Sequence, residues 1–307
     1  MMFDDPHETA RRLDLFKKDE NLEEYFFRLN EHLEGFDQGE VSSGPAYPLI
    51  YIVGLPRSGT TLLSQLISRY LPVGYINNVI ARFWRNPVVG IRLAQALLGS
   101  EARKMIELAS THGVTTGPWG PHEFGYFWRY WLRLDASPTH KLSKKHLDGL
   151  DHTGLADTLD RVVAAFQRPV VIKNIICGLQ AEYLTKIRQN SIFVLIERNP
   201  ESVAKSLLRV RKQRYGDQSV WWSLKPSTFL SIQKLTSGKA QIERQIVDGC
   251  SDFHVELSKP EVSCIRMTYE ELCCDPTKCI QMVADASSAL GYPLSLLDKP
   301  TPIKAKS

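Results

Sequence analysis

The chain has 307 residues, of which 43% are hydrophobic and 23% are charged, and 38 Lys and Arg against 34 Asp and Glu leave a formal net charge of +4. This composition is typical of an ordinary globular protein and excludes a disordered, collagen-like or coiled-coil chain. The small positive charge does not indicate a nucleic-acid partner, whereas it suits an anionic small-molecule ligand.

The sequence predicts a cytoplasmic protein with neither a transmembrane segment nor a signal peptide. The longest apolar runs are well short of the roughly 20 residues that span a bilayer, and the N-terminus is acidic and polar. The 6 cysteines include no CxxC pair and no zinc-finger spacing, so reduced thiols and no metal site are expected. Cys273, Cys274 and Cys279 are a possible metal group by spacing alone, but no histidine or fourth thiol lies near them in sequence.

The predicted elements start with an amphipathic helix over residues 9–33 and a loop over residues 39–45. Short continuous apolar runs follow, as expected of strands that are buried on both faces. These runs cover residues 48–53, 170–172, 192–196 and 262–267, and helical patterns at 155–166, 200–210 and 277–290 alternate with them. The alternation predicts an α/β fold of the P-loop type, with a parallel sheet covered by helices on both faces.

We expect a single domain over residues 1–307, because no linker or repeat divides the chain. It would carry an N-terminal helical extension over about residues 1–46 and a helical insertion over about residues 75–150. The insertion has no convincing strand and many aromatic residues, most of which core packing would explain. The segment 228–257 also has a helical pattern, which Gly238 and Gly249 are expected to interrupt.

A glycine-rich loop joins the first strand to a helix. Gly54, Gly59, Thr60 and Thr61 match the Walker A spacing, except that Thr60 stands where that motif has lysine. The free N–H groups and the dipole at the start of the helix favour an anion, and glycine allows a close approach and a positive φ. The only cation in the loop is Arg57, so the pattern predicts a phosphate site without the lysine of a kinase.

A second junction of strand and helix lies at residues 197–206. Asn199 is a good N-cap and Pro200 a good first helical residue, so a helix is expected to begin at the carboxyl end of the strand. Ligands of open α/β sheets bind outside these strand ends. Arg198 and Ser206 are therefore expected to hold one anion between them. Taken alone, the same pattern is also that of a capped helix with a surface arginine.

The two motifs resemble those of sulfotransferases that use 3′-phosphoadenosine-5′-phosphosulfate (PAPS). The segment from Pro56 to Thr61 is similar to their 5′-phosphosulfate loop, in the form found in tyrosylprotein and bacterial sulfotransferases. The spacing of Arg198 and Ser206 is similar to their 3′-phosphate motif. The drug-metabolising cytosolic branch instead has lysine in place of Arg57 and tryptophan in place of Leu62. The resemblance covers roughly residues 48–290, including a segment at 269–276 that we interpret as structural.

The resemblance implies a PAPS-dependent enzyme that transfers a sulfuryl group in line to a hydroxyl or amine and leaves adenosine 3′,5′-bisphosphate. We expect the acceptor to be a small molecule. It implies a set of nucleotide-binding residues: Arg57, Ser58, Gly59, Thr60, Thr61, Arg198 and Ser206. Arg57 and Lys173 would supply positive charge at the sulfuryl group. Lys173 resembles the lysine of a Lys-Asp-Pro motif, although Asn174 and Ile175 follow it here; a solvent-exposed strand-end lysine is the alternative.

The acceptor needs a base, and the best candidates are Glu123 and His122, a polar pair in an aromatic segment rich in Gly and Pro. The alternative for Glu123 is the first turn of a helix, where the dipole favours a carboxylate. Residues 209–225 carry 5 cations and 3 aromatic residues. They are expected to form either a lid over the nucleotide or a solvated helix end.

Two other functions compete with sulfuryl transfer. A P-loop kinase of a small metabolite would have a Walker A lysine and a magnesium-binding aspartate after a strand, where this sequence has Thr60 and the pair Glu197-Arg198. A non-catalytic nucleotide-binding protein of the same fold would tolerate replacement of both Lys173 and Glu123.

Overall fold

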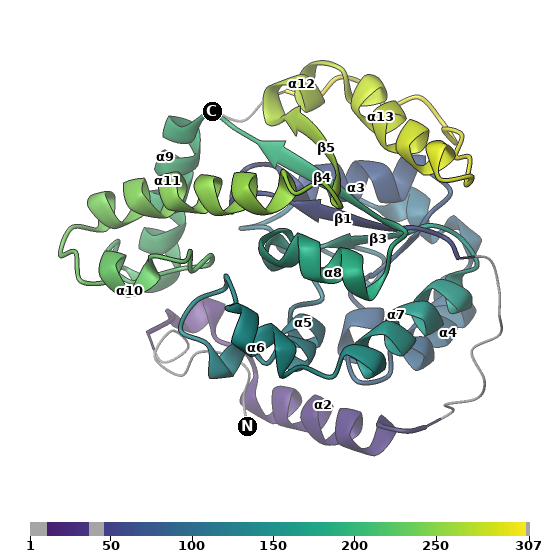
Figure 1. Cartoon of the computed structure of the whole chain (residues 1–307), viewed down its shortest axis with the longest axis horizontal. Coiled ribbons are helices and arrows are strands. Elements are labelled where there is room, and N and C mark those ends of the chain that lie inside the picture. Colours follow the sequence, from purple (N-terminus) through teal and green to yellow (C-terminus); the bar gives the residue numbers. More distant parts are fainter. Residues whose placement is uncertain (1–10, 37–45, 305–307) are drawn as a thin grey trace.

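The computed structural model describes residues 11–36 and 46–304 (Figure 1). In this part of the chain the strands form a five-stranded parallel sheet in the order β2-β3-β1-β4-β5. Their bounds are β1 (Leu49–Val53), β2 (Gly74–Tyr75), β3 (Val170–Lys173), β4 (Ser191–Glu197) and β5 (Ser263–Thr268). The four predicted strands and the predicted fold class are confirmed. The prediction that residue 75 lies outside any strand is wrong, because β2 pairs with β3 at the sheet edge.

Alternation along β1 divides the protein interior into two cores, because successive side chains of a strand point to opposite faces. Every residue of β1 is buried. Leu49, Tyr51 and Val53 pack into one core, and Ile50 and Ile52 pack into the other. This is why the strand reads as one continuous apolar run.

Helices cover both faces of the sheet, as predicted. One core takes side chains from α3 (Thr60–Tyr70), α12 (Tyr269–Cys274) and α13 (Pro276–Ala289). The other takes side chains from α7 (His152–Phe166), α8 (Ala181–Ile187), α9 (Pro200–Tyr215) and α11 (Gly238–Leu257). Figure 1 shows α12 and α13 on one side of the strands and α7 and α8 on the other.

After Tyr75 of β2, the regular elements of the predicted insertion are helices joined by irregular segments, and its aromatic residues build the core beneath it. Its helices are η2 (Ile80–Arg82), α4 (Pro87–Leu98), η3 (Ser100–Met105), α5 (Gly125–Trp131), η4 (Leu134–Ala136) and α6 (Lys144–Asp148). Trp84, Phe127 and Trp128 are almost completely buried. The Trp128 ring lies 6.0 Å from the Tyr51 ring of β1, which ties α5 to the sheet.

Two helix predictions are wrong in their bounds. The N-terminal helix α2 (Glu20–Leu33) begins at residue 20 rather than 9. Asp19 caps the helix, because its side chain accepts a hydrogen bond from the Leu22 N–H. A short turn, η1 (Asp14–Phe16), precedes the helix. Residues 9–10 and the predicted loop 39–45 lie outside the described residues.

The second error concerns the segment 228–257. A break does separate α10 (Phe229–Ile232) from α11, which starts at Gly238 with Ser237 as its N-cap. Gly249, however, does not interrupt α11. A Cβ built on Gly249 would lie 2.8 Å from Leu55 Cδ2 and 3.0 Å from Leu224 Cδ2, so this glycine allows close packing within a continuous helix.

The strand order places the two predicted junctions next to each other. β1 and β4 are parallel neighbours, so the loop after Val53 and the turn after Glu197 emerge at the same edge of the sheet. β3 is the other neighbour of β1 and brings Lys173 to that edge. Within residues 11–36 and 46–304, no helix is both long and apolar enough to cross a membrane.

Candidate functional site

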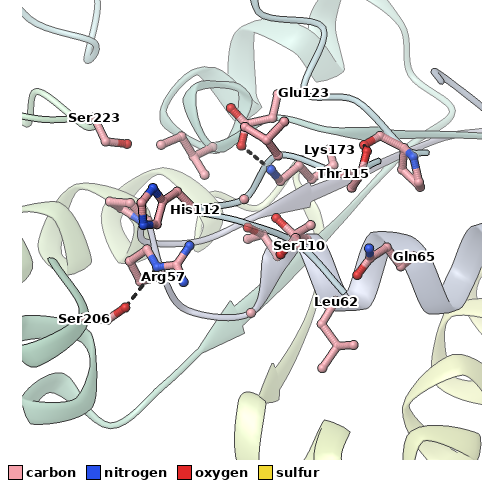
Figure 2. A pocket seen from close by; sticks show the side chains of 18 of the residues that line it. Arg57, Leu62, Gln65, Ser110, His112, Thr115, Glu123, Lys173, Ser206 and Ser223 are labelled. Carbon is pink, nitrogen blue, oxygen red and sulfur yellow. Dashed lines mark hydrogen bonds and ion pairs between the residues drawn. The ribbon is translucent and has the colours of Figure 1, made fainter. Parts of the chain in front are cut away.

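A cavity of about 400 Å³ opens at the carboxyl ends of β1, β3 and β4. Figure 2 shows side chains from the β1–α3 loop, the insertion, β3 and α9 converging on it. Nine of the predicted site residues line it: Arg57, Gly59, Thr60, Thr61, His122, Glu123, Lys173, Arg198 and Ser206. Ser58 is the exception, since it is buried beneath the loop and its hydroxyl has no partner among the described residues.

The loop has the backbone that the sequence predicts for an anion site. Gly54 and Gly59 both have positive φ, and α3 begins at Thr60, directly after Gly59. The first N–H groups of α3 therefore face the cavity without helical partners. Arg57 also has a positive φ of 72°. A left-handed conformation is costly for a residue with a Cβ, and such strain concentrates at functional sites.

Arginine side chains crowd this end of the cavity. Arg57 Nε donates to Ser206 Oγ over 3.0 Å, and Arg198 Nη1 donates to the Arg57 carbonyl over 3.2 Å. Burial lowers the pKa of Arg57, and the nearby charges of Arg198 and Arg209 lower it further. The cluster is thus short of negative charge and is suited to a phosphate or sulfate ligand.

Lys173 and Glu123 form an ion pair on the other side of the loop (Figure 2). Lys173 is 4% exposed, whereas the Glu123 side chain is 50% exposed toward the cavity. Asn174 Nδ2 donates to the Glu123 carbonyl over 2.9 Å and fixes the backbone at this point. Lys173 is therefore not a solvated strand-end lysine.

The environment keeps Glu123 ionised. Burial would raise its pKa, but the charge of Lys173 and its hydrogen bond outweigh this effect and lower the pKa. The alternative position for Glu123, in the first turn of a helix, does not apply, since α5 begins at Gly125 and has no acidic residue in its first turn. The carboxylate projects from irregular backbone at the cavity wall.

His122 is less suited to proton transfer than Glu123. Its Nδ1 accepts a hydrogen bond from the Phe124 N–H over 2.9 Å, so the ring proton is on Nε2. Burial lowers the pKa of His122 to about 4, so the imidazole is neutral near pH 7. A neutral ring with its unprotonated nitrogen occupied has no free site for a proton.

Several cavity residues were not predicted from the sequence. Tyr269, interpreted there as structural, lies with its ring 4.2 Å below the Arg198 guanidinium and lines the cavity. The segment 269–276 was noted in the sequence, but only the fold brings β5, which precedes Tyr269, next to β4. His112 also lines the cavity, although nothing in its local sequence marks it.

The segment 209–225 contributes side chains both to the cavity wall and to the core, and its role as a lid over the nucleotide stays a prediction. Arg209, Arg214, Trp222 and Ser223 line the cavity. Arg211 turns away and is fully buried against the side-chain oxygens of Gln241 and Gln245. Gln245 Nε2 in turn donates to the carbonyls of Trp222 and Leu224, which anchors the loop that bears Trp222.

Comparison with known proteins gives one family. A model described as "Sulfotransferase family" matches residues 48–289. Among solved structures, the chain is similar to sulfotransferase STF9 from Mycobacterium avium, with 16% identity, a TM-score of 0.52, and coverage of 87% of this chain and 71% of that chain. It is also similar to sulfotransferase STF1 from Mycobacterium tuberculosis H37Rv, with 15% identity, a TM-score of 0.48, and coverage of 89% and 76% respectively. A sequence search of curated proteins gave no match.

Proposed function

The chain belongs to the sulfotransferase family, and we propose that it transfers a sulfuryl group from PAPS to a hydroxyl or amine of a small-molecule acceptor. The observation that carries the proposal is the convergence of three features on one cavity. These are the phosphate loop, the arginine cluster around Ser206, and the ion pair of Lys173 and Glu123.

The cavity residues divide into two nucleotide-binding groups. The N–H groups of Gly59, Thr60 and Thr61, with Arg57, would bind the 5′-phosphosulfate. Arg198 and Ser206 would bind the 3′-phosphate. Arg57 contacts both Ser206 and Arg198, so the protein itself links the two groups directly. Tyr269, which supports Arg198 from below, would keep that guanidinium in place.

The chemistry requires one proton acceptor and neutralisation of the leaving phosphate. Bound PAPS supplies the sulfuryl group and a phosphate leaving group. Glu123 would take the proton of the acceptor O–H or N–H as the new bond to sulfur forms and the bond between sulfur and the phosphate oxygen breaks. Arg57 and Lys173 would stabilise the negative charge that moves onto the leaving group.

Calorimetric titration with adenosine 3′,5′-bisphosphate, without magnesium, tests the nucleotide site. We expect Arg198→Ala to weaken binding about 10- to 100-fold, because a hydrogen bond to a charged group contributes about 1.5–3 kcal/mol. Arg28→Ala, an exposed arginine on α2, is the matched control and should bind like the native protein. If the native protein binds ATP with magnesium but not adenosine 3′,5′-bisphosphate, the kinase alternative replaces the proposal. Nucleotide binding without transfer to any acceptor would favour the non-catalytic alternative.

The pH dependence of kcat/KM tests Glu123 as the base. Since the pKa of Glu123 is lowered from its ordinary value of 4.5, the carboxylate persists as the pH falls. We therefore expect the acid limb of the profile to lie below pH 4.5, with circular dichroism used to show that the protein is still folded there. An acid limb near neutral pH would assign the base to a different group.

A further inference from the structure

A second set of polar groups lies at one end of the cavity. We call it the Arg214 cluster; it consists of Arg214, His112, Trp222 and Ser223, with Phe16 packed against it. The members come from the end of α9, a turn in the insertion, the loop after α9, and η1. None of them belongs to the two sulfotransferase-like motifs.

The Arg214 guanidinium lies close to two aromatic rings and forms no ion pair with a described carboxylate. Its guanidinium carbon lies 5.3 Å from the centre of the Phe16 ring and 5.8 Å from the Trp222 ring. Its Nε is buried without a hydrogen-bond partner among the described residues. None of the ion pairs formed by the described carboxylates includes Arg214. A guanidinium fixed in this way is ready to accept a carboxylate, sulfate or phosphate group.

His112 presents an unused acceptor nitrogen at the same place. It lies in a tight turn in which Thr111 and Val114 exchange backbone hydrogen bonds of 3.0 and 2.9 Å. Nε2 lies 2.7 Å from Gln213 Oε1, which places the ring proton on Nε2. Nδ1 is then an acceptor, and it is buried without a partner among the described residues. The ring centre lies 5.4 Å from that of Phe16.

The residues of the Arg214 cluster line the same cavity as Glu123. Figure 2 shows Ser223, His112 and Glu123 on one side of Arg57 and Leu62 on the other. The turn that carries His112 reaches the reaction centre, since a Cβ built on Gly113 would lie 3.5 Å from Thr61 Oγ1 and 3.9 Å from Glu123 Oε1. A molecule in contact with the Arg214 cluster is therefore close to the proposed base.

We infer that the Arg214 cluster is the acceptor subsite and that the acceptor carries an anionic group, such as a carboxylate, in addition to its reacting hydroxyl or amine. The inference rests on the proposed sulfuryl transfer. Arg214 binds the anionic group, Trp222 packs against the body of the acceptor, and His112 Nδ1 accepts a hydrogen bond from a second donor. The reacting O–H or N–H then gives its proton to Glu123 as its oxygen or nitrogen bonds to the sulfuryl sulfur. The bond between that sulfur and the phosphate oxygen breaks, and adenosine 3′,5′-bisphosphate leaves.

The experiment compares acceptors that differ only in charge. 4-Hydroxyphenylacetate and its methyl ester serve as probes, both for binding to the complex of the enzyme with adenosine 3′,5′-bisphosphate and as acceptors with PAPS. We expect the native protein to favour the acid about 10- to 100-fold over the ester, because the acid forms a charged hydrogen bond with Arg214. Arg214→Met keeps the apolar stem and should reduce the preference to about unity while nucleotide affinity stays unchanged.

Two further variants sharpen the result. Arg28→Met, on the exposed face of α2, is the matched control and should keep the preference of the native protein. His112→Asn tolerates the positive φ of 52° and should weaken both probes equally.

The inference is overturned if acid and ester are not distinguished, or if Arg214→Met keeps the preference. Loss of nucleotide affinity in Arg214→Met would instead assign Arg214 to the nucleotide site, and failure of the native protein to bind the nucleotide would refute the proposed function itself.

Discussion

Replacement of Glu123 by glutamine is expected to lower kcat for sulfuryl transfer by about 10²- to 10⁴-fold, which is the range that a positioned general base contributes. Glutamine keeps the volume of the side chain and a carbonyl oxygen that accepts a hydrogen bond from Lys173. It removes the charge that takes the proton from the acceptor. Affinity for adenosine 3′,5′-bisphosphate should change little, because Arg57, Arg198 and Ser206 are unaltered.

Single-turnover and steady-state kinetics with PAPS measure this effect. Glu243→Gln is the matched control, since Glu243 lies on the exposed face of α11 and its only ion pair in the described chain is with Lys239 at 3.9 Å. Its kcat should equal that of the native protein. A loss of less than about tenfold in Glu123→Gln would show that Glu123 serves only as the partner of Lys173 and that proton transfer uses another group.

Replacement of Gly59 by alanine is expected to lower kcat/KM for PAPS by about 10²-fold or more, the scale of effect that a displacement of about 1 Å produces in a catalytic site. A Cβ at this position would lie 2.6 Å from Tyr269 Cδ2 and 3.2 Å from Ile196 Cδ1. The Tyr269 ring must move, and Arg198, which lies over it, must follow. The positive φ of 108° adds backbone strain at the N-terminus of α3.

The variant Gly291→Ala distinguishes the effect of backbone strain in Gly59→Ala from the effect of the steric clash with Tyr269. Gly291 has a similar φ of 87°, but a Cβ built there meets no atom within 4 Å. Both variants should lose about 1–3 kcal/mol of unfolding free energy in urea, while only Gly59→Ala should lose nucleotide affinity. Equal affinity in Gly59→Ala and the native protein would mean that the loop can adapt to a side chain and that the position of Tyr269 does not matter.

The fold was predictable because its strands are short and buried on both faces. Continuous apolar runs located β1, β3, β4 and β5, and the cap formed by Asn199 and Pro200 located the start of α9. β2 has 2 residues, too few for any periodicity to be visible. The bounds of α2 and α11 were wrong because a capping side chain and tertiary packing, respectively, outweighed the local pattern.

The candidate site was predictable only where all residues of one binding motif lie in a single short segment of the sequence. The phosphate loop and the junction at Arg198 are of this kind. Lys173 and Glu123 were predicted as site residues from two separate motifs. They lie 50 positions apart in the sequence, and only the folded chain shows that they form an ion pair. His112 was not predicted, and Trp222 was included only as part of the segment 209–225. Their positions at the cavity depend on contacts with Phe16, Gln213 and Gln245. The catalytic and binding roles assigned to the nominated residues stay predictions.

The order of the strands has a consequence for how the protein matures on the ribosome. β1 leaves the ribosome well before both of its neighbours, because β3 and β4 begin only at Val170 and Ser191. Tyr269, which packs against Gly59 and supports Arg198, is synthesised later still. Pairing of such distant segments is slow, because long loops must close before any contact forms. A growing chain therefore acquires the complete cavity only after β5 and Tyr269 have been synthesised, and chains that stop before β5 lack it.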